Sequence, residues 1–362
     1  MSKLDEARKI INEVDREMAD LFVKRMRAAE LVAAHKMERG LPILDAAREE
    51  EVVRKNAEYI EDNALRSYYV NFIKYNMTLS RRYQRRLLDG MRVAYSGVPG
   101  AFADIATKKI FPDATPVPCK DFKAAYEAVV SGECDCAVLP IENSYAGDVS
   151  QVMDLGFFGS LFINGVYDME IVQNLVGVEG ATPWDVREVI SHPQALSQCA
   201  EYIRDHEFIT HEATNTAVAA QDVAKAGRKD YAAIASVETA ELYGLKVIEK
   251  GINESSNNTT RFAVFSRFSN QSPNDNYFVM NFTVKNEAGG LSEAISAIGK
   301  AGFNLRALKS RPNKELIWEY YFFAEGEGNI NSEQGEQMLA ELKKHCSNLK
   351  VVGSFAREIK LR

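Results

Sequence analysis

The stretch "MRVAYSGVPG", Met91 to Gly100, marks the point where the character of the chain changes. The 90 residues before it hold one proline and two glycines, and their apolar residues recur at helical spacing. After it, short apolar runs alternate with helical stretches, which is the pattern of an α/β fold. We therefore expect a multidomain chain with an all-helical part, residues 1–90, followed by α/β structure.

Composition narrows the class of protein. A chain of 362 residues predicts two or three domains, and a net charge of −7 gives no sign of nucleic-acid binding. The five cysteines are odd in number and lack metal-ligand spacing, so we expect reduced packing thiols. The first residues, "MSKLDEARKIINEVDREM", lack a signal-peptide core, and no apolar run approaches the roughly 20 residues of a membrane span. We expect a cytoplasmic protein that binds no membrane, metal or cofactor.

The first helix carries an arginine in its apolar seam. Written as heptads, the seam reads Leu4, Ala7, Ile11, Val14, Met18, Leu21, Arg25, Ala28, Val32 and His35. A buried guanidinium needs an anion. Arg25 therefore has either an internal carboxylate partner, such as Glu30 or Glu49, or a carboxylate-bearing ligand, and periodicity alone does not choose.

Two further cations lie on the same helix. Lys36 is eleven residues beyond Arg25, roughly 16 Å along the axis, so the two side chains can close around a small dianion. Arg8 lies roughly 25 Å away in the other direction and cannot reach that ligand from the same helix. If Arg8 takes part, it comes from a second, antiparallel copy of the chain, which predicts a dimer.

Polar residues on the next helices complete this predicted pocket. Ser80 and Gln84 are four residues apart and lie beside the apolar stripe of the third helix. Asp45 is the expected N-cap of the second helix, with Arg48 and Glu49 in its first turn. Such a set offers cations, neutral donors and carboxylates, and it suits a reaction that needs only confinement and charge stabilisation.

Residues 1–90 resemble the all-helical chorismate mutase domain, three helices that form an intertwined dimer. The resemblance implies rearrangement of chorismate to prephenate. It implies these roles: carboxylate binding by Arg8 of the partner chain, Arg25 and Arg48; donation to the ether oxygen by Lys36 and Gln84; contact with the ring hydroxyl by Asp45 and Glu49; and pocket lining by Ser80.

The middle of the chain, residues 91–268, has strands that end in polar residues, where open α/β sheets bind ligands. The blocks "VAYSGVPGAFADIA", "PIENSYAGDV", "SHPQALSQC" and "TTRFAVFSR" resemble prephenate dehydratase. The resemblance implies two α/β lobes with a crevice between them, as in periplasmic binding proteins. It also implies that prephenate loses its ring hydroxyl and CO₂ to give phenylpyruvate.

The resemblance places Thr260 at the leaving hydroxyl, while Arg261 binds a carboxylate or orders the loop. Glu142 is either an acid or a structural residue, and these two roles stay open. His192 fits a structural hydrogen-bonding role. The further substrate-binding residues it implies are Asn143, Ser144, Ser191, Gln198 and Thr216. The turn before the helix that starts near Phe102 either presents amides to a carboxylate or is an ordinary βα turn.

A polar linker, residues 269–275, precedes a segment that resembles an ACT domain, a ferredoxin-like α+β regulatory fold, over residues 276–362. In that family a glycine-rich turn and an "SRP" turn bind L-phenylalanine at a dimer interface. The positions carried over are Gly289, Gly290, Leu291, Ser310, Arg311 and Pro312. Lys309 stands where the family usually has glutamate, which places a cation near the ligand amine.

The leading hypothesis is a bifunctional chorismate mutase and prephenate dehydratase with feedback inhibition by L-phenylalanine. One alternative is a dehydratase that prefers arogenate, which differs from prephenate by an amino group. The other is a ligand-sensing regulator without catalysis.

Overall fold

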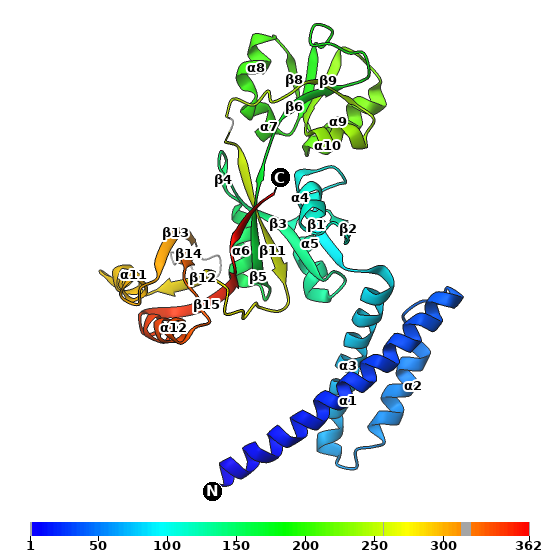
Figure 1. The fold of residues 1–362 in the computed structure, drawn as a ribbon, viewed down its shortest axis with the longest axis vertical. Helices are drawn as coiled ribbons and strands as arrows, with labels where there is room; N and C mark the ends of the chain where they lie inside the picture. The colour runs from blue at the N-terminus through cyan, green and yellow to red at the C-terminus, as the bar shows by residue number, and fades with distance from the viewer. Residues whose placement is uncertain (1, 256, 313–319, 362) are drawn as a thin grey trace. The chain divides into compact units, whose positions relative to one another are not determined.

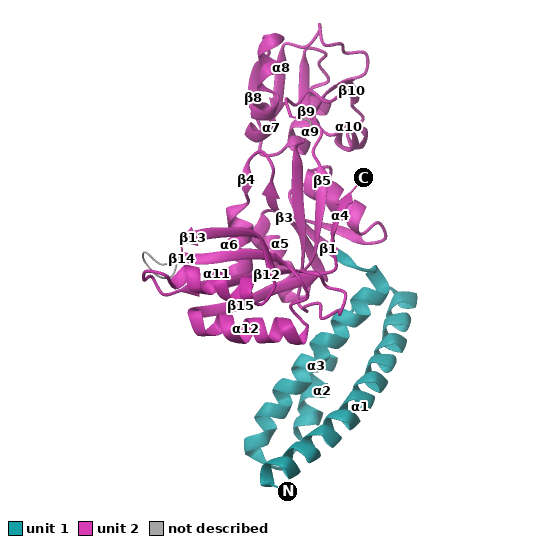
Figure 2. Cartoon of the chain, turned by 60° about the vertical axis from the view of Figure 1, so that its left-hand side comes forward, with its two compact units in different colours: residues 1–92 teal, residues 93–362 magenta. Residues whose placement is uncertain are grey.

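The computed structural model describes residues 2–255, 257–312 and 320–361. The chain divides into two compact units, Met1–Arg92 and Val93–Arg362 (Figure 2). Within the described ranges, no helix combines the length and the apolar character that a membrane crossing requires.

The first unit is helical, as predicted, and its described helices are α1 (Lys3–Arg39), α2 (Ala46–Ala57) and α3 (Asn63–Asp89). Helix α1 begins with a capping box between Ser2 and Asp5. The predicted N-cap of α2 is confirmed, since the Asp45 carboxylate accepts from the backbone N–H of Arg48. Small buried residues of α1, such as Ala33, allow α3 to pack closely against it.

Much of the apolar seam of α1 lies exposed, since no element among the described residues covers it. Leu4, Ile11, Val14 and Leu21 are between 47 % and 63 % exposed, although their heptad spacing is that of a buried stripe. Exposed apolar stripes of this length are characteristic of protein interfaces.

The second unit contains two sheets (Figure 1). The larger has eleven described strands and runs β13-β14-β12-β15-β5-β11-β3-β1-β2, with β4 beside β3 and β16 beside β5. The elements of its first lobe are β1 (Arg92–Ser96), α4 (Phe102–Ile110), β2 (Thr115–Cys119), α5 (Phe122–Ser131), β3 (Cys136–Asn143), β4 (Gly147–Asp148), α6 (Ser150–Phe158), β5 (Phe162–Glu170) and β11 (Thr259–Ser266).

The second lobe is built on a separate five-stranded sheet in the order β10-β6-β9-β7-β8. Its elements are β6 (Asn174–Gly177), β7 (Glu188–Ser191), α7 (Pro193–Gln198), α8 (Ala200–Asp205), β8 (Ile209–Glu212), α9 (Thr216–Ala226), β9 (Tyr231–Ala235), α10 (Val237–Leu242) and β10 (Lys246–Glu249). The chain enters this lobe after β5 and returns to the first lobe through β11 (Figure 1). Each lobe has its own buried apolar clusters, so the predicted two-lobed α/β arrangement is present.

The C-terminal module follows in the order βαββαβ, with β12 (Tyr277–Val284), α11 (Gly290–Lys300), β13 (Asn304–Pro312), β14 (Tyr320–Glu327), α12 (Glu333–His345) and β15 (Cys346–Phe355). Its antiparallel strand order β13-β14-β12-β15 is ferredoxin-like.

This module shares its sheet with the first lobe. Strand β15 touches β5 at Gly353, where an added Cβ would lie 1.9 Å from the carbonyl oxygen of Ile163, so only glycine permits the approach. The last strand, β16 (Glu358–Leu361), pairs in parallel with β5. The end of the chain is therefore a part of the first lobe's sheet.

Candidate active sites

In the first unit, Arg25 of α1 points its guanidinium at α3. It donates to Asn76 Oδ1 at 3.0 Å and to the hydroxyl of Ser80. Both partners are neutral. Burial lowers the pKa of Arg25, as expected for a cation whose surroundings do not compensate its charge.

Both carboxylates considered as internal partners of Arg25 are bound elsewhere. Glu30 accepts from Arg27 at 2.7 Å and from the hydroxyl of Tyr83. Glu49 forms an ion pair with Arg81 of α3. The structure therefore favours the other alternative, in which the anion that Arg25 requires is a ligand.

The remaining predicted residues of the first unit are placed as follows. Ser80 and Gln84 are both buried on α3, and the Gln84 amide oxygen has no partner among the described residues. The Lys36 ammonium donates to the carbonyl of Ile43. Arg48 forms an exposed ion pair of 2.6 Å with Glu51. Arg8 is exposed, seventeen residues from Arg25 on the same helix.

In the second unit, a cavity of about 700 Å³ lies between the two lobes, within the size range of small-molecule sites. Residues of the first lobe and residues of the second both line it. The lining residues with polar side chains include Ser96, Lys120, Asn143, Gln173, His192, Gln194, Gln198, Asn215, Thr216 and Thr260. Four of the predicted substrate residues, Asn143, Gln198, Thr216 and Thr260, are thus brought together.

Asn143 and Thr260 are paired across β3 and β11. The Asn143 side-chain oxygen accepts from the backbone N–H groups of Tyr145 and Ala146 at 3.0 and 2.9 Å, which determines which end of the amide is the nitrogen. That nitrogen donates to Thr260 Oγ1 at 2.9 Å. Since the Thr260 oxygen accepts this bond, its own proton is free to donate to a ligand.

A chain of side-chain amides continues from Asn143. It donates to Asn258 Oδ1 at 2.9 Å, and Asn258 donates in turn to Gln198 Oε1 at 3.0 Å. Gln173 donates to the same oxygen at 3.2 Å. The acceptor of Gln198 is therefore occupied, and its amino group remains for a ligand.

Sequence reasoning missed Gln173, Asn258 and Lys120. The first two lie just before β6 and β11, at the places where the chain passes between the lobes. A polar residue at each crossing is the signal that could have identified them, because a crevice between lobes is lined by the crossing segments.

The electrostatics of the cavity favour an anion. Among the described lining residues Lys120 is the one with a formal charge, and none is acidic. The N-terminal ends of α4 and α9 also line the cavity at Phe102 and Thr216, and helix N-termini carry partial positive charge. Burial lowers the pKa of His192, which caps α7 through Nδ1, so this ring is neutral at pH 7. The structural role predicted for His192 is present, and the ring also lines the cavity.

Two other predicted residues, Ser144 and Ser191, do not line this cavity. The Ser191 hydroxyl donates to the carbonyl of Ile234 at 2.6 Å, and the Ser144 hydroxyl donates to the carbonyl of Asn257 at 2.9 Å. The backbone N–H of Gly100 donates to Asp104, so it is not available to a ligand. These groups support the loops around the cavity.

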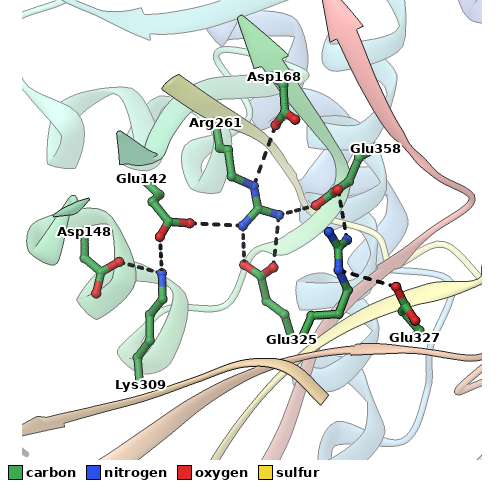
Figure 3. A network of polar contacts seen from close by, with 9 residues as sticks. Glu142, Asp148, Asp168, Arg261, Lys309, Glu325, Glu327 and Glu358 are labelled. Atoms are coloured by element: carbon green, nitrogen blue, oxygen red, sulfur yellow. Dashed lines mark hydrogen bonds and ion pairs between the residues drawn. The ribbon is translucent and has the colours of Figure 1, made fainter. Parts of the chain in front are cut away.

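Glu142 and Arg261 are paired across the same two strands, one position from Asn143 and Thr260. Neighbouring side chains of a strand point to opposite faces. Arg261 contacts Glu142 at 3.1 Å, Glu325 at 3.0 Å, Asp168 at 3.7 Å and also Glu358 (Figure 3). Burial lowers the pKa of Arg261, but these carboxylates outweigh it and the net shift is upward. Arg261 is therefore saturated with carboxylates of the protein itself.

The two turns predicted to be regulatory lie at one end of the C-terminal sheet. Gly289 has a φ of 90°, and an added Cβ at Gly290 would lie 2.7 Å from a backbone oxygen, so both positions require glycine. Leu291 packs on the core of the module. Strand β14 places Ser310 level with the end of β12, because Phe322 pairs with both Ser310 and Phe282.

The last residues of β13 face the first lobe. Arg311 Nε lies 3.0 Å from the Asp154 carboxylate of α6, and its Nη1 donates to the Ser150 hydroxyl at 2.6 Å. Lys309 lies 2.8 Å from Glu142 and 2.5 Å from Asp148. The cation at position 309 thus has two carboxylate partners in the first lobe. Pro312 is the last described residue of the strand.

Comparisons with known proteins agree with this architecture. Residues 93–270 match the family model of prephenate dehydratase, and residues 7–85 match chorismate mutase type II. "Arogenate dehydratase/prephenate dehydratase 1, chloroplastic" of Arabidopsis thaliana is 30 % identical over 74 % of this chain and 73 % of its own. "Bifunctional chorismate mutase/prephenate dehydratase" of Aquifex aeolicus is 29 % identical over 99 % of both chains.

Among solved structures, prephenate dehydratase in complex with L-Phe from Arthrobacter aurescens has a TM-score of 0.69 and 26 % identity, covering 74 % of this chain and 90 % of that one. The family matches divide the chain where the fold divides it, at the junction of the helical and the α/β unit. The chain therefore belongs to the prephenate dehydratase family and carries a chorismate mutase type II domain in its helical unit.

Proposed function

We propose that the helical unit rearranges chorismate to prephenate and that the two-lobed unit converts prephenate to phenylpyruvate, a sequence of reactions in L-phenylalanine synthesis. The observation that carries the second activity is the cavity between the lobes. Its described lining has a lysine, two helix N-termini and no carboxylate, and Thr260 has its proton free for the leaving group. Such a site suits a dianion that must lose a hydroxyl and a carboxylate.

The dehydratase step needs one proton and consumes one carboxylate. As the bond to the ring carboxylate breaks, its electron pair enters the ring and the opposite hydroxyl leaves as water after taking a proton. Prephenate and one proton thus give phenylpyruvate, CO₂ and water. We assign Thr260 to the leaving oxygen, as a relay rather than as the ultimate acid, because a threonine hydroxyl is far too weak an acid by itself.

Asn143 and the amide chain behind it hold this arrangement. Their hydrogen bonds are made before substrate arrives, so orienting them costs nothing during the reaction. The Gln198 amino group and Thr216 are left to bind carboxylate or keto oxygens. For Arg261 the contacts favour the predicted role of ordering the loop, and for Glu142 they favour the structural role, since each side chain is bound to charged groups of the protein.

For the mutase we propose an intertwined dimer. The exposed seam residues of α1 supply the interface, and an antiparallel partner would bring its Arg8 to the Arg25 of this chain. Arg25 and Arg48 then bind carboxylates. Gln84, together with Lys36, donates to the ether oxygen. The ring hydroxyl contacts Asp45 and Glu49, beside Ser80. To bind a ligand, the side chains of Lys36, Arg48 and Glu49 must exchange their present partners.

Prephenate is the preferred substrate in this proposal, because the helical unit of the same chain produces it. Arogenate is the alternative, since relatives of the two-lobed unit carry that name. We also propose that L-phenylalanine binds the C-terminal module, an ACT domain, near its two turns and inhibits the dehydratase. The L-Phe complex of the Arthrobacter enzyme supports this.

The test is to incubate the purified chain with chorismate and to quantify prephenate and phenylpyruvate over time. We expect prephenate to appear first and phenylpyruvate to follow. Prephenate that accumulates without phenylpyruvate would reject prephenate dehydration, and adding arogenate would then identify the alternative. Untouched chorismate in a folded dimer would favour the regulator without catalysis.

A further inference from the structure

Two ionic contacts between the C-terminal module and the first lobe, those of Lys309 and Glu325, meet at neighbouring strand positions beside the cavity. On β3 and β11, Asn143 and Thr260 form the pair that lines the cavity, and Glu142 and Arg261 form the next pair. A β-bulge follows directly after Arg261. Bulges beside active sites change the direction in which the neighbouring side chains point. The alignment of Thr260 therefore depends on how this short stretch is held.

Two side chains of the C-terminal module, Glu325 and Lys309, bind this stretch of β3 and β11. Glu325 of β14 is 5 % exposed and binds both ends of the Arg261 guanidinium at 3.0 Å. Lys309 of β13 bridges Glu142 and Asp148 at 2.8 and 2.5 Å. Figure 3 shows Arg261 with carboxylates on several sides, and the Lys309 ammonium between Glu142 and Asp148.

The cluster has more anions than cations. Six carboxylates, those of Glu142, Asp148, Asp168, Glu325, Glu327 and Glu358, surround three cations, Arg261, Arg306 and Lys309. Burial and the nearby Glu358 raise the pKa of Asp168, which is the expected response of a carboxyl group in such surroundings. Removal of the Lys309 ammonium would leave the carboxylates of Glu142 and Asp148 repelling each other at the ends of β3 and β4.

We propose that Lys309 and Glu325 are positioning residues of the dehydratase site, which act through Glu142 and Arg261 on the Asn143–Thr260 pair. This inference rests on the proposed function of the cavity. It makes the C-terminal module a structural part of that site, and any ligand that moves β13 or β14 would alter the alignment of Thr260. It also explains what Lys309 does at the position where the family usually has glutamate.

The main test compares Lys309→Met with Lys309→Arg, and uses Lys344→Met as the matched control. Lys344 forms an exposed ion pair with Glu341 within α12 and touches no residue of the cluster. We expect Lys309→Met to lower the dehydratase kcat about tenfold or more, since small misplacements of a reacting group cost that much, with KM changed less than threefold. Lys309→Arg should restore most of kcat, and Lys344→Met should match the wild type.

A double-variant cycle tests the route. If Lys309 acts through Glu142, the double variant Glu142→Gln, Lys309→Met should have a dehydratase kcat no lower than that of the slower single variant. If the losses of kcat in the two single variants multiply in the double variant, the proposal is overturned, because Glu142 would then act independently of Lys309. Glu325→Gln should reproduce the loss of kcat. A Lys309→Met protein with lower thermal stability but wild-type kcat would also overturn it, since the lysine would then be merely structural.

A readout that does not depend on turnover separates this inference from the proposed function. Hydrogen–deuterium exchange should become faster in Lys309→Met for peptides that cover residues 139–146 and 257–264, and not in Lys344→Met. If the wild type makes no phenylpyruvate but these peptides lose protection, the proposed function fails, and what remains is the coupling of Lys309 to the Asn143–Thr260 pair. If the wild type is active and their protection is unchanged, the inference alone fails.

Discussion

The two units solve the same chemical problem, the binding of a small dianion, in different ways. In the helical unit the half-buried cation Arg25 donates to the neutral groups of Asn76 and Ser80, several predicted ligand-binding side chains are bound to other residues, and an apolar stripe lies exposed. In the two-lobed unit the amides that face the cavity are already hydrogen-bonded to one another and anchored to backbone N–H groups.

This difference indicates which part of the molecule orders the side chains of each site before a ligand binds. For the helical unit we propose a site that a second copy completes, because the apolar seam of α1 is exposed in the single chain. The two-lobed unit encloses its cavity within one chain and takes extra support from the module that shares its sheet. The first site should therefore depend on oligomeric state, and the second should depend on local alignment.

The largest effect should come from Thr260. Thr260→Ala removes the hydroxyl beside the leaving group and should lower the dehydratase rate about 10²-fold or more, while the mutase rate stays unchanged. Thr259→Ala, one residue earlier on the same strand, is the matched control. Phenylpyruvate formation from prephenate measures the effect. An unchanged rate in Thr260→Ala would remove this residue from the site and break the comparison.

A mixed dimer tests the need for a second copy. Arg8→Ala and Arg25→Ala should each lower the mutase rate about 10²-fold or more, with prephenate dehydration unaffected. A dimer with one chain of each kind, purified through two different tags, has one intact site and should recover about half of the wild-type rate. A wild-type dimer with the same two tags is the control. Without recovery, Arg8 and Arg25 do not meet across chains.

The smallest effect concerns the neutral histidine of the cavity. Burial depresses the pKa of His192 below its ordinary value of about 6.5, so the unfolded chain binds this proton more readily than the folded one. Its contribution to stability is present above pH 6.5 and is lost as the pH falls toward the lower folded-state pKa.

His192→Asn keeps a side chain that can cap α7 and removes this titration. Between pH 7.5 and 5.5 the melting temperature of the wild type should fall by a few degrees more than that of the variant. Calorimetry of both proteins at several pH values measures this difference. Parallel curves would show that His192 is not held neutral by its surroundings.

Sequence reasoning located the helices and strands more accurately than the direction in which their side chains point. Asp45 was identified as a helix cap, because capping is a local property. Glu142 and Arg261 were predicted at the site with their neighbours, yet adjacent residues of a strand cannot both face one cavity. Which member of each pair faces the substrate depends on the pairing of β3 with β11, whose residues are more than 110 positions apart in the sequence.

The sequence by itself determined the division into a helical and an α/β unit, the chemistry available to each, and the residues that need glycine or a cap, since all of these follow from local spacing. Only the tertiary structure decided that Glu30 and Glu49 are bound elsewhere, that Gln173 lines the cavity while Asn258 links Asn143 to Gln198, and that Lys309 supports Glu142. The physical reason is that a side chain's charge or hydrogen bond is satisfied by whichever group the folded chain brings within about 3 Å, and distant segments supply those groups.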